Sequence, residues 1–209
     1  MIYKEIMFLK SDWKRFLLTL VFVAVMIGYF AYNGTETSIL MFLSFSVPGF
    51  VVSLETIHNS ISKEKMNGMF EKMLTLHKLS RILIVKAVLA FIVSVIVTLF
   101  CSGFVTLFLC CNQNLVIGTD VLFCQLAIAI CADWTISIVL VVLYLLLDQM
   151  FVINACVMGI MLFLSVICCG VVTADSILLY TISCCAIIFG IGMLIAFLLR
   201  YIPNRVALK

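Results

Sequence analysis

The sequence predicts an all-α integral membrane protein with six transmembrane helices, and three observations support this fold class. The 209 residues are 66% hydrophobic and only 11% charged, whereas soluble domains are about 45–50% apolar and about 25% charged. Long apolar runs recur along the chain, and every Lys and Arg lies in segments expected on one side of a membrane. This composition excludes a soluble enzyme, a disordered tail and a nucleic-acid-binding protein.

Six apolar runs are long enough to cross the hydrocarbon core, which requires about 20 residues in a helix. They cover residues 16–35, 37–54, 87–111, 121–147, 149–174 and 176–199. The second run is the shortest and contains Pro48 followed by Gly49. Because neighbouring helices can satisfy the backbone groups that a proline frees, we expect a kink in this helix rather than a break.

The basic residues determine the predicted orientation. All 13 Lys and Arg residues lie before the first run, between the second and third runs, or after the sixth. The connections around Glu36, Asp120 and Asp175 contain none. Since cytoplasmic connections carry the excess of Lys and Arg, we expect both termini and residues 55–86 to lie in the cytoplasm.

The first 15 residues are predicted to form a helix in the membrane interface. Their apolar side chains recur at helical spacing at Ile2, Ile6, Leu9 and Trp13, while the lysines fall on other faces. A helix with one apolar and one basic face lies at the boundary of lipid and water. A simple membrane anchor would have the same pattern.

A second amphipathic helix is expected within residues 55–86, the long connection between the second and third spans. Met66, Phe70, Met73 and His77 recur at spacings of four, three and four residues, with Lys and Glu on the other faces. A solvated helix resting on lipid headgroups is one interpretation of such a charged face. Apolar anchors that enter a groove of a partner protein are the other.

This segment also carries a family resemblance. The run 61–77, followed by Ser80, Arg81 and Lys86, resembles the loop between helices two and three of ABC-2 type transporter permeases. In that family an acidic–basic pair, a glycine, an apolar residue and a glutamate lead through leucines to a proline, where this chain has His77. The segment from Tyr3 to Arg15 is similar to the connecting helix of the same family.

The resemblance implies a half-transporter whose coupling helix docks on a separate ATP-binding subunit, which holds ATP and Mg²⁺. It also implies a second permease copy, identical or different. The residues implied to contact the ATPase are Glu64, Lys65, Met66, Gly68, Phe70, Glu71, Met73 and Leu74. The chain has no G-x-x-x-x-G-K-[ST] phosphate loop, so we expect a transport subunit that neither hydrolyses ATP nor holds a cofactor itself.

The expected cargo is hydrophobic or amphipathic, because the external connections are short and the spans are rich in Phe, Leu, Ile and Met. Compact permeases of this type resemble exporters of antimicrobial or amphipathic peptides, which favours a peptide cargo crossing a bacterial cytoplasmic membrane. The alternative is a membrane immunity or sensor protein that binds a peptide or partner without transporting it. Co-purification of an ATPase subunit would distinguish the exporter hypothesis from the immunity or sensor hypothesis.

Asp133 is the ionisable residue predicted to lie near the bilayer midplane, in the fourth span. An ionisable group at this depth is costly and is a functional-site hypothesis by default. No Lys or Arg falls within a span to pair with it, so we expect its carboxyl to be protonated or hydrogen-bonded to Thr135, Ser137 or a second protomer. A place on the substrate path and a structural polar contact between helices are equally compatible with the sequence.

The ten cysteines lie in or at the ends of apolar runs, without a C-x-x-C pair. Zinc and iron–sulfur sites normally show such local spacing, so no metal site is predicted. Free cysteine commonly behaves as a small buried hydrophobe, which is the preferred interpretation. A disulfide in the outer half of the bilayer is the alternative.

The predicted topology can be tested by labelling single cysteines in sealed cells, in a background without native cysteines. A membrane-impermeant thiol reagent is expected to label cysteines placed at Glu36, Asn114 and Asp175, because these positions are predicted to face outward. It is expected to miss cysteines placed at Lys65 and Lys209. Labelling of Lys65→Cys from outside would contradict the orientation and the transporter hypothesis together.

Overall fold

In the computed structural model, the described part of the chain is helical throughout. It comprises residues 37–68, 72–74, 78–113, 119–147 and 176–201, with single residues or pairs between 14 and 29 and between 152 and 167. Four long helices account for most of it: α3 (Thr37–Met66), α5 (Leu79–Gln113), α6 (Thr119–Leu146) and α8 (Ile177–Leu198). A short 3₁₀ helix, η1 (Leu199–Tyr201), continues α8.

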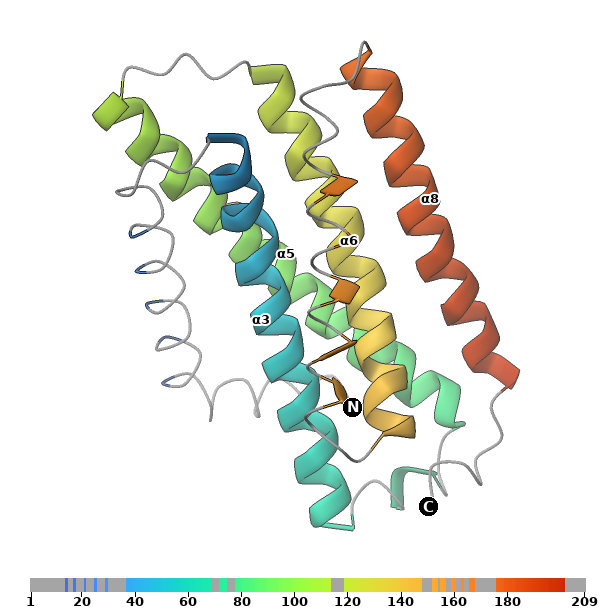
Figure 1. Cartoon of the computed structure of the whole chain (residues 1–209). Helices are drawn as coiled ribbons and strands as arrows, with labels where there is room; N and C mark the ends of the chain where they lie inside the picture. The colour runs from blue at the N-terminus through green and yellow to red at the C-terminus, as the bar shows by residue number, and fades with distance from the viewer. Residues whose placement is uncertain are drawn as a thin grey trace.

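These helices run side by side (Figure 1). α3 packs against α5 and α6, α5 packs against α6, and α6 packs against α8. Within the described ranges, three segments are long and apolar enough to cross a membrane: Leu79–Phe104, Asp120–Leu146 and Ile177–Tyr201. The predicted all-helical fold is therefore confirmed for the described residues, and three of their helices are candidates to span a membrane.

Two predicted spans, 16–35 and 149–174, lie almost entirely outside the described residues, as does the predicted interfacial helix 1–15. Within the first of them, the described positions Leu17 and Val25 are helical, and their side chains are exposed. Exposed apolar side chains are typical of a helix that faces lipid. The six-span count stays a prediction.

Much of the predicted loop 55–86 is helical. α3 continues past Leu54 to Met66, and α5 begins at Leu79 rather than Ala87. Met66, the first residue of the predicted amphipathic stripe, is the last residue of α3. Where the membrane ends along these helices stays a prediction. The connection that remains between α3 and α5 spans residues 67–78.

The helices extend because their added turns bury apolar surface. On α3, Ile57 and Ile61 are 1% exposed, and on α5, Leu79, Ile82 and Leu83 are fully buried, all in one hydrophobic core. Burying a side chain of this kind stabilises the fold by about 1.5–3 kcal/mol. Counting an apolar run only as far as its first charged residue underestimates the length of the helix. A helix continues past a charged residue when its apolar stripe continues.

α3 continues unbroken through Pro48, as predicted. Pro48, Gly49 and Phe50 are all buried. A proline inside a helix removes one backbone hydrogen bond and leaves the carbonyl four residues earlier without its donor. The close packing of neighbouring helices around this point keeps the helical path intact.

α8 contacts the bundle along one narrow stripe. A Cβ atom built on Gly192 would lie 2.9 Å from both Thr135 Oγ1 and Trp134 Cδ1 of α6, so the absence of a side chain permits this close approach. The Thr135 hydroxyl donates to the Ile188 carbonyl of α8 at 2.7 Å, and Trp134 stacks on Phe189 at 6.1 Å. Most other apolar side chains of α8 are exposed, as expected for a helix surrounded by lipid.

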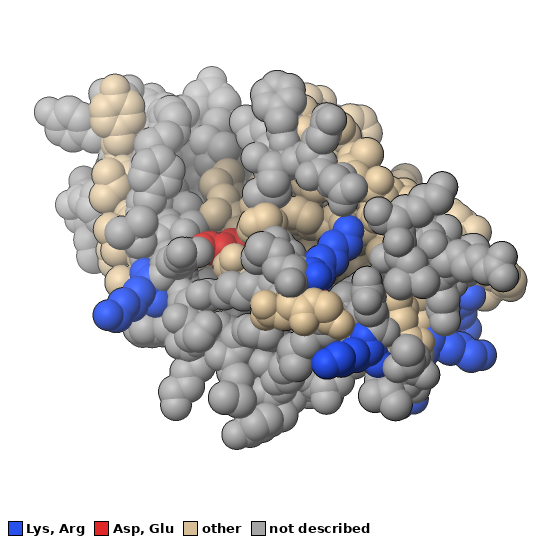
Figure 2. Space-filling model, turned by 90° about the horizontal axis from the view of Figure 1, so that it is seen from below, with Lys and Arg blue, Asp and Glu red and all other residues tan. Residues whose placement is uncertain are grey.

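Exposed basic side chains gather at one end of the bundle, where α3 and α8 end and α5 begins. These residues are Lys65, Lys72, Lys78, Arg81 and Arg200. Figure 2 shows this end, with Lys and Arg at several places across the face. We call it the basic end. Its concentration of charge agrees with the expected cytoplasmic side of a membrane protein.

Candidate functional site

Polar side chains are buried at the interface of α3, α5 and α6, at three successive levels along the bundle. We call this set the buried polar column. It consists of Thr98 and Asp133, then Ser53 and Ser137, then Ser60, Glu64 and Lys86. Each member is at most 4% exposed. Buried polar groups are expensive unless they are hydrogen-bonded, so these contacts hold the three helices in register.

The first level lies around Asp133, at the centre of α6. Its side chain is 1% exposed, and Oδ2 accepts a hydrogen bond of 3.0 Å from the Thr98 hydroxyl of α5. The Ser94 hydroxyl of α5 also interacts with this carboxyl. From α3, the backbone of Gly49 closes the site, because a Cβ atom there would lie 2.6 Å and 2.8 Å from the two carboxyl oxygens.

Neither Thr135 nor Ser137, the two hydroxyls predicted to bond Asp133, is its partner, and a bond to a second protomer stays a prediction. Thr135 points the other way around α6 and donates to the Cys131 and Ile188 carbonyls. Ser137 pairs with Ser53 of α3. The partner is Thr98, which lies 35 positions earlier in the chain, so only the packing of α5 on α6 brings it to Asp133. A place for Asp133 on a substrate path stays a prediction.

The second level is one helical turn nearer to the basic end. The hydroxyls of Ser53 and Ser137 are 3.2 Å apart, and both side chains are fully buried. Ser53 follows Gly49 by four residues, and Ser137 follows Asp133 by four. Residues four apart share a helix face, so the α3–α6 contact made at Gly49 and Asp133 continues as a hydroxyl pair.

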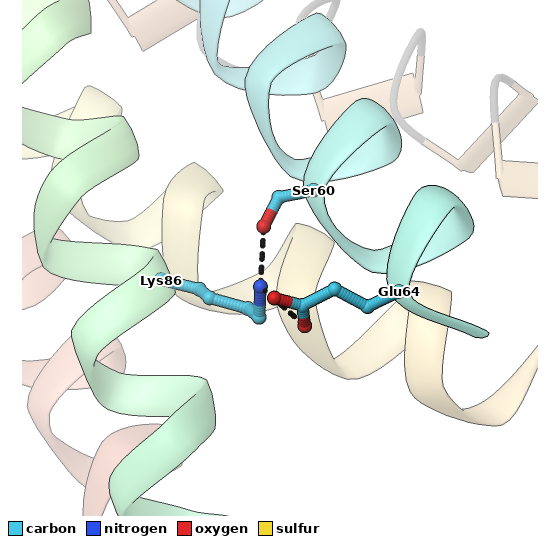
Figure 3. A network of polar contacts seen from close by, with 3 residues as sticks. All are labelled: Ser60, Glu64 and Lys86. Atoms are coloured by element: carbon cyan, nitrogen blue, oxygen red, sulfur yellow. Dashed lines mark hydrogen bonds and ion pairs between the residues drawn. The ribbon is translucent and has the colours of Figure 1, made fainter. Parts of the chain in front are cut away.

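The third level is a buried ion pair near the basic end. Lys86 Nζ of α5 lies 2.8 Å from Glu64 Oε2 of α3, with side chains 1% and 0% exposed. The same ammonium group donates to the Ser60 hydroxyl. Figure 3 shows the Lys86 side chain reaching from α5 to both α3 residues. This contact joins the two helices directly at the base of their connection.

Glu64, assigned to a contact with a partner subunit, is 0% exposed and paired with Lys86 within this chain. A direct contact of Glu64 with a partner stays a prediction. Its negative charge is retained in the bundle because the ammonium of Lys86 compensates it. Glu64 is therefore a positioning residue, which fixes the last turn of α3.

The other residues assigned to ATPase contact lie in different environments. Lys65 is exposed, and Met66 ends α3. Gly68 has φ +61°, a backbone conformation that favours glycine, and nothing lies within 4 Å of a Cβ atom built there. Met73 and Leu74 are half-buried against the hydrophobic core, so part of their apolar surface is used within this chain.

Phe70 and Glu71, the expected centre of the coupling helix, lie outside the described residues. The three described residues that follow, 72–74, are helical, and Lys72 is exposed. The Gly68 N–H donates to the Lys65 carbonyl at 3.2 Å, which closes the turn at the end of α3. The connection thus starts with a tight reversal that presents basic side chains at its surface.

Sequence reasoning missed Thr98, Gly49 and the pairing of Lys86 with Glu64. Thr98 and Gly49 carry no charge and sit in apolar runs, where hydroxyl and small residues are common at helix contacts. One sequence feature could have indicated the ion pair: Lys86 is a charged residue directly before the third predicted span. Such a charge in an extended helix needs a partner if it is buried.

The described residues contain no group of three or more His, Cys, Asp or Glu side chains placed to hold a metal ion. Six cysteines whose side chains the structure describes are free thiols: Cys101, Cys124, Cys131, Cys156, Cys184 and Cys185. The site chemistry of this part is therefore that of hydroxyls, one carboxyl and one ion pair. Such groups bind and pass protons and position helices.

Comparisons with known proteins give no match. No protein-family model, curated protein or solved structure matches the chain.

The ion pair of the third level gives a direct test of the packing. Lys86→Met removes the ammonium that compensates Glu64, and breaking a buried pair in this way typically costs about 3–5 kcal/mol. Lys86→Met combined with Glu64→Met is expected to recover most of this loss, because no charge is then buried. Thermal unfolding of the purified protein in detergent measures both effects.

The matched control is Lys78→Met, which removes an exposed lysine near the start of α5 and is expected to change stability by at most about 0.5 kcal/mol. Equal stability of Lys86→Met and Lys78→Met would show that the ion pair does not hold α3 and α5 together.

Proposed function

We propose that the chain is the membrane permease subunit of an ATP-driven ABC exporter, working with a separate ATP-binding subunit. The observation that carries the proposal is the buried ion pair between Lys86 and Glu64. It ties the connection 67–78, with its exposed basic side chains, to the two helices that run up to Asp133. A partner that moves this connection would therefore move α3 and α5 as one body.

α3 and α5 connect the basic end directly to the Asp133 site. From Glu64 to Gly49, α3 rises roughly 20 Å, and α5 covers a similar length between Lys86 and Thr98. Gly49 and Thr98 both contact the Asp133 carboxyl. A tilt imposed at the basic end thus acts on the packing around a carboxyl at the centre of the bundle. Helix tilts of this kind switch access in transporters.

The surface proposed to meet the ATPase is the connection 67–78 with the end of α3. Lys65 and Lys72 are exposed there, and Gly68 makes the reversal that presents them. On this surface, Phe70 is proposed as the apolar anchor and Glu71 as the acidic contact. The docking cleft of the partner should be acidic opposite Lys65 and Lys72 and should carry a basic residue opposite Glu71, which would steer and orient the two proteins.

ATP and Mg²⁺ are proposed to bind the partner subunit, and the permease to pair with a second copy, identical or different. The cargo proposed is a hydrophobic or amphipathic peptide exported across a bacterial cytoplasmic membrane, with both permease termini in the cytoplasm. The strongly apolar exposed face of α8 supports a chain that lies in lipid. A membrane immunity or sensor protein without transport is the competing function.

Charge reversal at the proposed docking surface tests the function. Lys65→Glu combined with Lys72→Glu should leave the bundle folded, since both side chains are exposed. It should weaken ATPase binding at least tenfold, because like charges across an interface cost several kcal/mol. The measurement is the ATPase activity that co-purifies with the tagged permease from its native membranes, together with peptide export from the same cells.

The control is Asp120→Lys, a charge reversal at an exposed residue at the opposite end of the bundle. It is expected to keep both ATPase and export. If the wild-type permease brings down no ATP-hydrolysing subunit, the exporter proposal fails and the immunity or sensor function is favoured. Equal ATPase recovery with the double variant would instead place the contact elsewhere.

A further inference from the structure

Asp133 has an environment that the transport proposal does not require. The carboxyl sits at the centre of α6, is 1% exposed, and is enclosed by α3 and α5. A polar contact between helices would be served by a serine or asparagine at far smaller cost than an aspartate, which is expensive at this depth when charged. An acid in this place therefore points to the one thing that an asparagine cannot do, which is to bind and release a proton.

The hydrogen bonds around Asp133 suit a neutral acid. A carboxylate accepts at about four lone-pair sites, and among the described residues two hydroxyls reach it, Thr98 at 3.0 Å and Ser94. The Ser94 hydroxyl also lies 2.9 Å from the Phe91 carbonyl and can donate there instead. A protonated Asp133 can donate to Ser94 while it accepts from Thr98, so both contacts are satisfied.

No described charged group faces Asp133 from any helix packed against it. α3 presents the Gly49 backbone, and α5 presents the hydroxyls of Ser94 and Thr98. Lys86, the buried lysine of α5, is committed to Glu64 and Ser60. On the other side of α6, helix α8 (177–198) contains Tyr and Cys but no Asp, Glu, His, Lys or Arg.

A series of hydroxyls leads from Asp133 toward the basic end. The Ser53–Ser137 pair lies one turn away, and Ser60 lies two turns further along α3, beside Lys86. Between them on α3, Thr56 has a buried hydroxyl oxygen without a hydrogen-bond partner among the described residues. Hydroxyls both donate and accept, and one water molecule can bridge groups that are one turn apart.

We propose that Asp133 is a proton-binding site, and that its proton exchanges with water at the basic end through the hydroxyls of the buried polar column. In the packing seen here Gly49 seals the carboxyl, so the proton is held. When α3 moves off α6, water enters beside the hydroxyls of the column, the O–H bond of Asp133 breaks, and its proton passes along them to water at the basic end while the carboxylate becomes hydrated. The reverse movement takes one proton back.

This inference does not depend on an ATPase partner. A permease driven by ATP would load and unload Asp133 as its helices tilt, and a protein without an ATPase could use the proton itself as its driving ion. In both cases the ligand of the site is a single proton, and the residue that controls access is Gly49. A variant with a larger side chain at Gly49 would clash with both carboxyl oxygens.

The first test is the infrared spectrum of the full-length protein in lipid vesicles at neutral pH. The wild-type protein should show the C=O absorption of a protonated carboxyl, and Asp133→Asn should lose it. Asp120→Asn, which changes an exposed carboxylate of the same helix, should lose only carboxylate absorption. If Asp133→Asn instead loses a carboxylate band and no protonated one, the proposal is wrong.

A wild-type sample labelled with ¹³C at the aspartate carboxyl carbons gives the same answer without a substitution. Solid-state NMR should then show one protonated aspartate at neutral pH, and a spectrum with ionised aspartates alone would overturn the proposal even if Asp133→Asn does not fold. The two spectroscopic results do not involve ATPase binding, so they fail or succeed independently of the exporter function.

The second test addresses the route. After transfer into D₂O, the protonated-carboxyl band should shift as the proton exchanges. Ser53→Ala combined with Ser137→Ala should slow this shift several-fold, whereas Ser183→Ala, at an exposed hydroxyl of α8, should leave its rate unchanged. An unchanged rate in the double variant would remove the column as the path of the proton.

Discussion

The architecture depends on a few polar side chains that are buried in an apolar bundle and paired across helix–helix contacts, because a buried polar group without a partner is expensive. Asp133, Ser137 and Lys86 each meet this need across a helix–helix contact. Apolar packing between lipid-immersed helices discriminates weakly among alternative rotations of a helix. The polar contacts specify which faces of α3, α5 and α6 meet and at which height.

Small residues make these contacts possible. Gly49 lets the backbone of α3 approach the carboxyl of α6, and Gly192 does the same for α8 against Trp134 and Thr135. Individual hydrogen bonds between membrane helices contribute on average about 0.6 kcal/mol, so their value lies in specificity more than in total stability. The ion pair is different, since loss of one partner leaves a buried charge. Rigid coupling is therefore greatest near the basic end, where the connection between α3 and α5 begins.

The apolar runs predicted α6 and α8 to within two residues, because long uninterrupted hydrophobic segments have one stable form in a membrane. The runs did not predict the last residues of α3 or the first residues of α5. Counting stopped at Glu55 and Lys86, although the apolar stripe of each helix continues past these charges. The position of Asp133 in the middle of its helix was predictable, because it lies at similar distances from both ends of its apolar run. Its contact with Thr98 was not predictable, because contacts between side chains of different helices depend on how the helices rotate and tilt.

The pairing of Glu64 with Lys86 could not be predicted from the sequence for a related reason. A surface role was inferred from a local pattern of charges, but its partner Lys86 lies on the next helix, and only the folded connection brings the two together. Exposed Lys65 is its direct neighbour in the chain, so adjacent charges of one motif have opposite environments. A charge pattern thus indicates an amphipathic segment, whereas burial decides which of its charges are structural.

The central claim is that the contact between Thr98 and Asp133 joins α5 to α6, and a double-mutant cycle tests it most directly. The free energy of unfolding in detergent would be measured for Thr98→Val, Asp133→Leu, the double variant and the wild type. A coupling free energy of about 0.6–1.7 kcal/mol is expected, the range found for hydrogen bonds between membrane helices. Effects of the two substitutions that simply add would show that the two side chains do not interact, and would contradict the account.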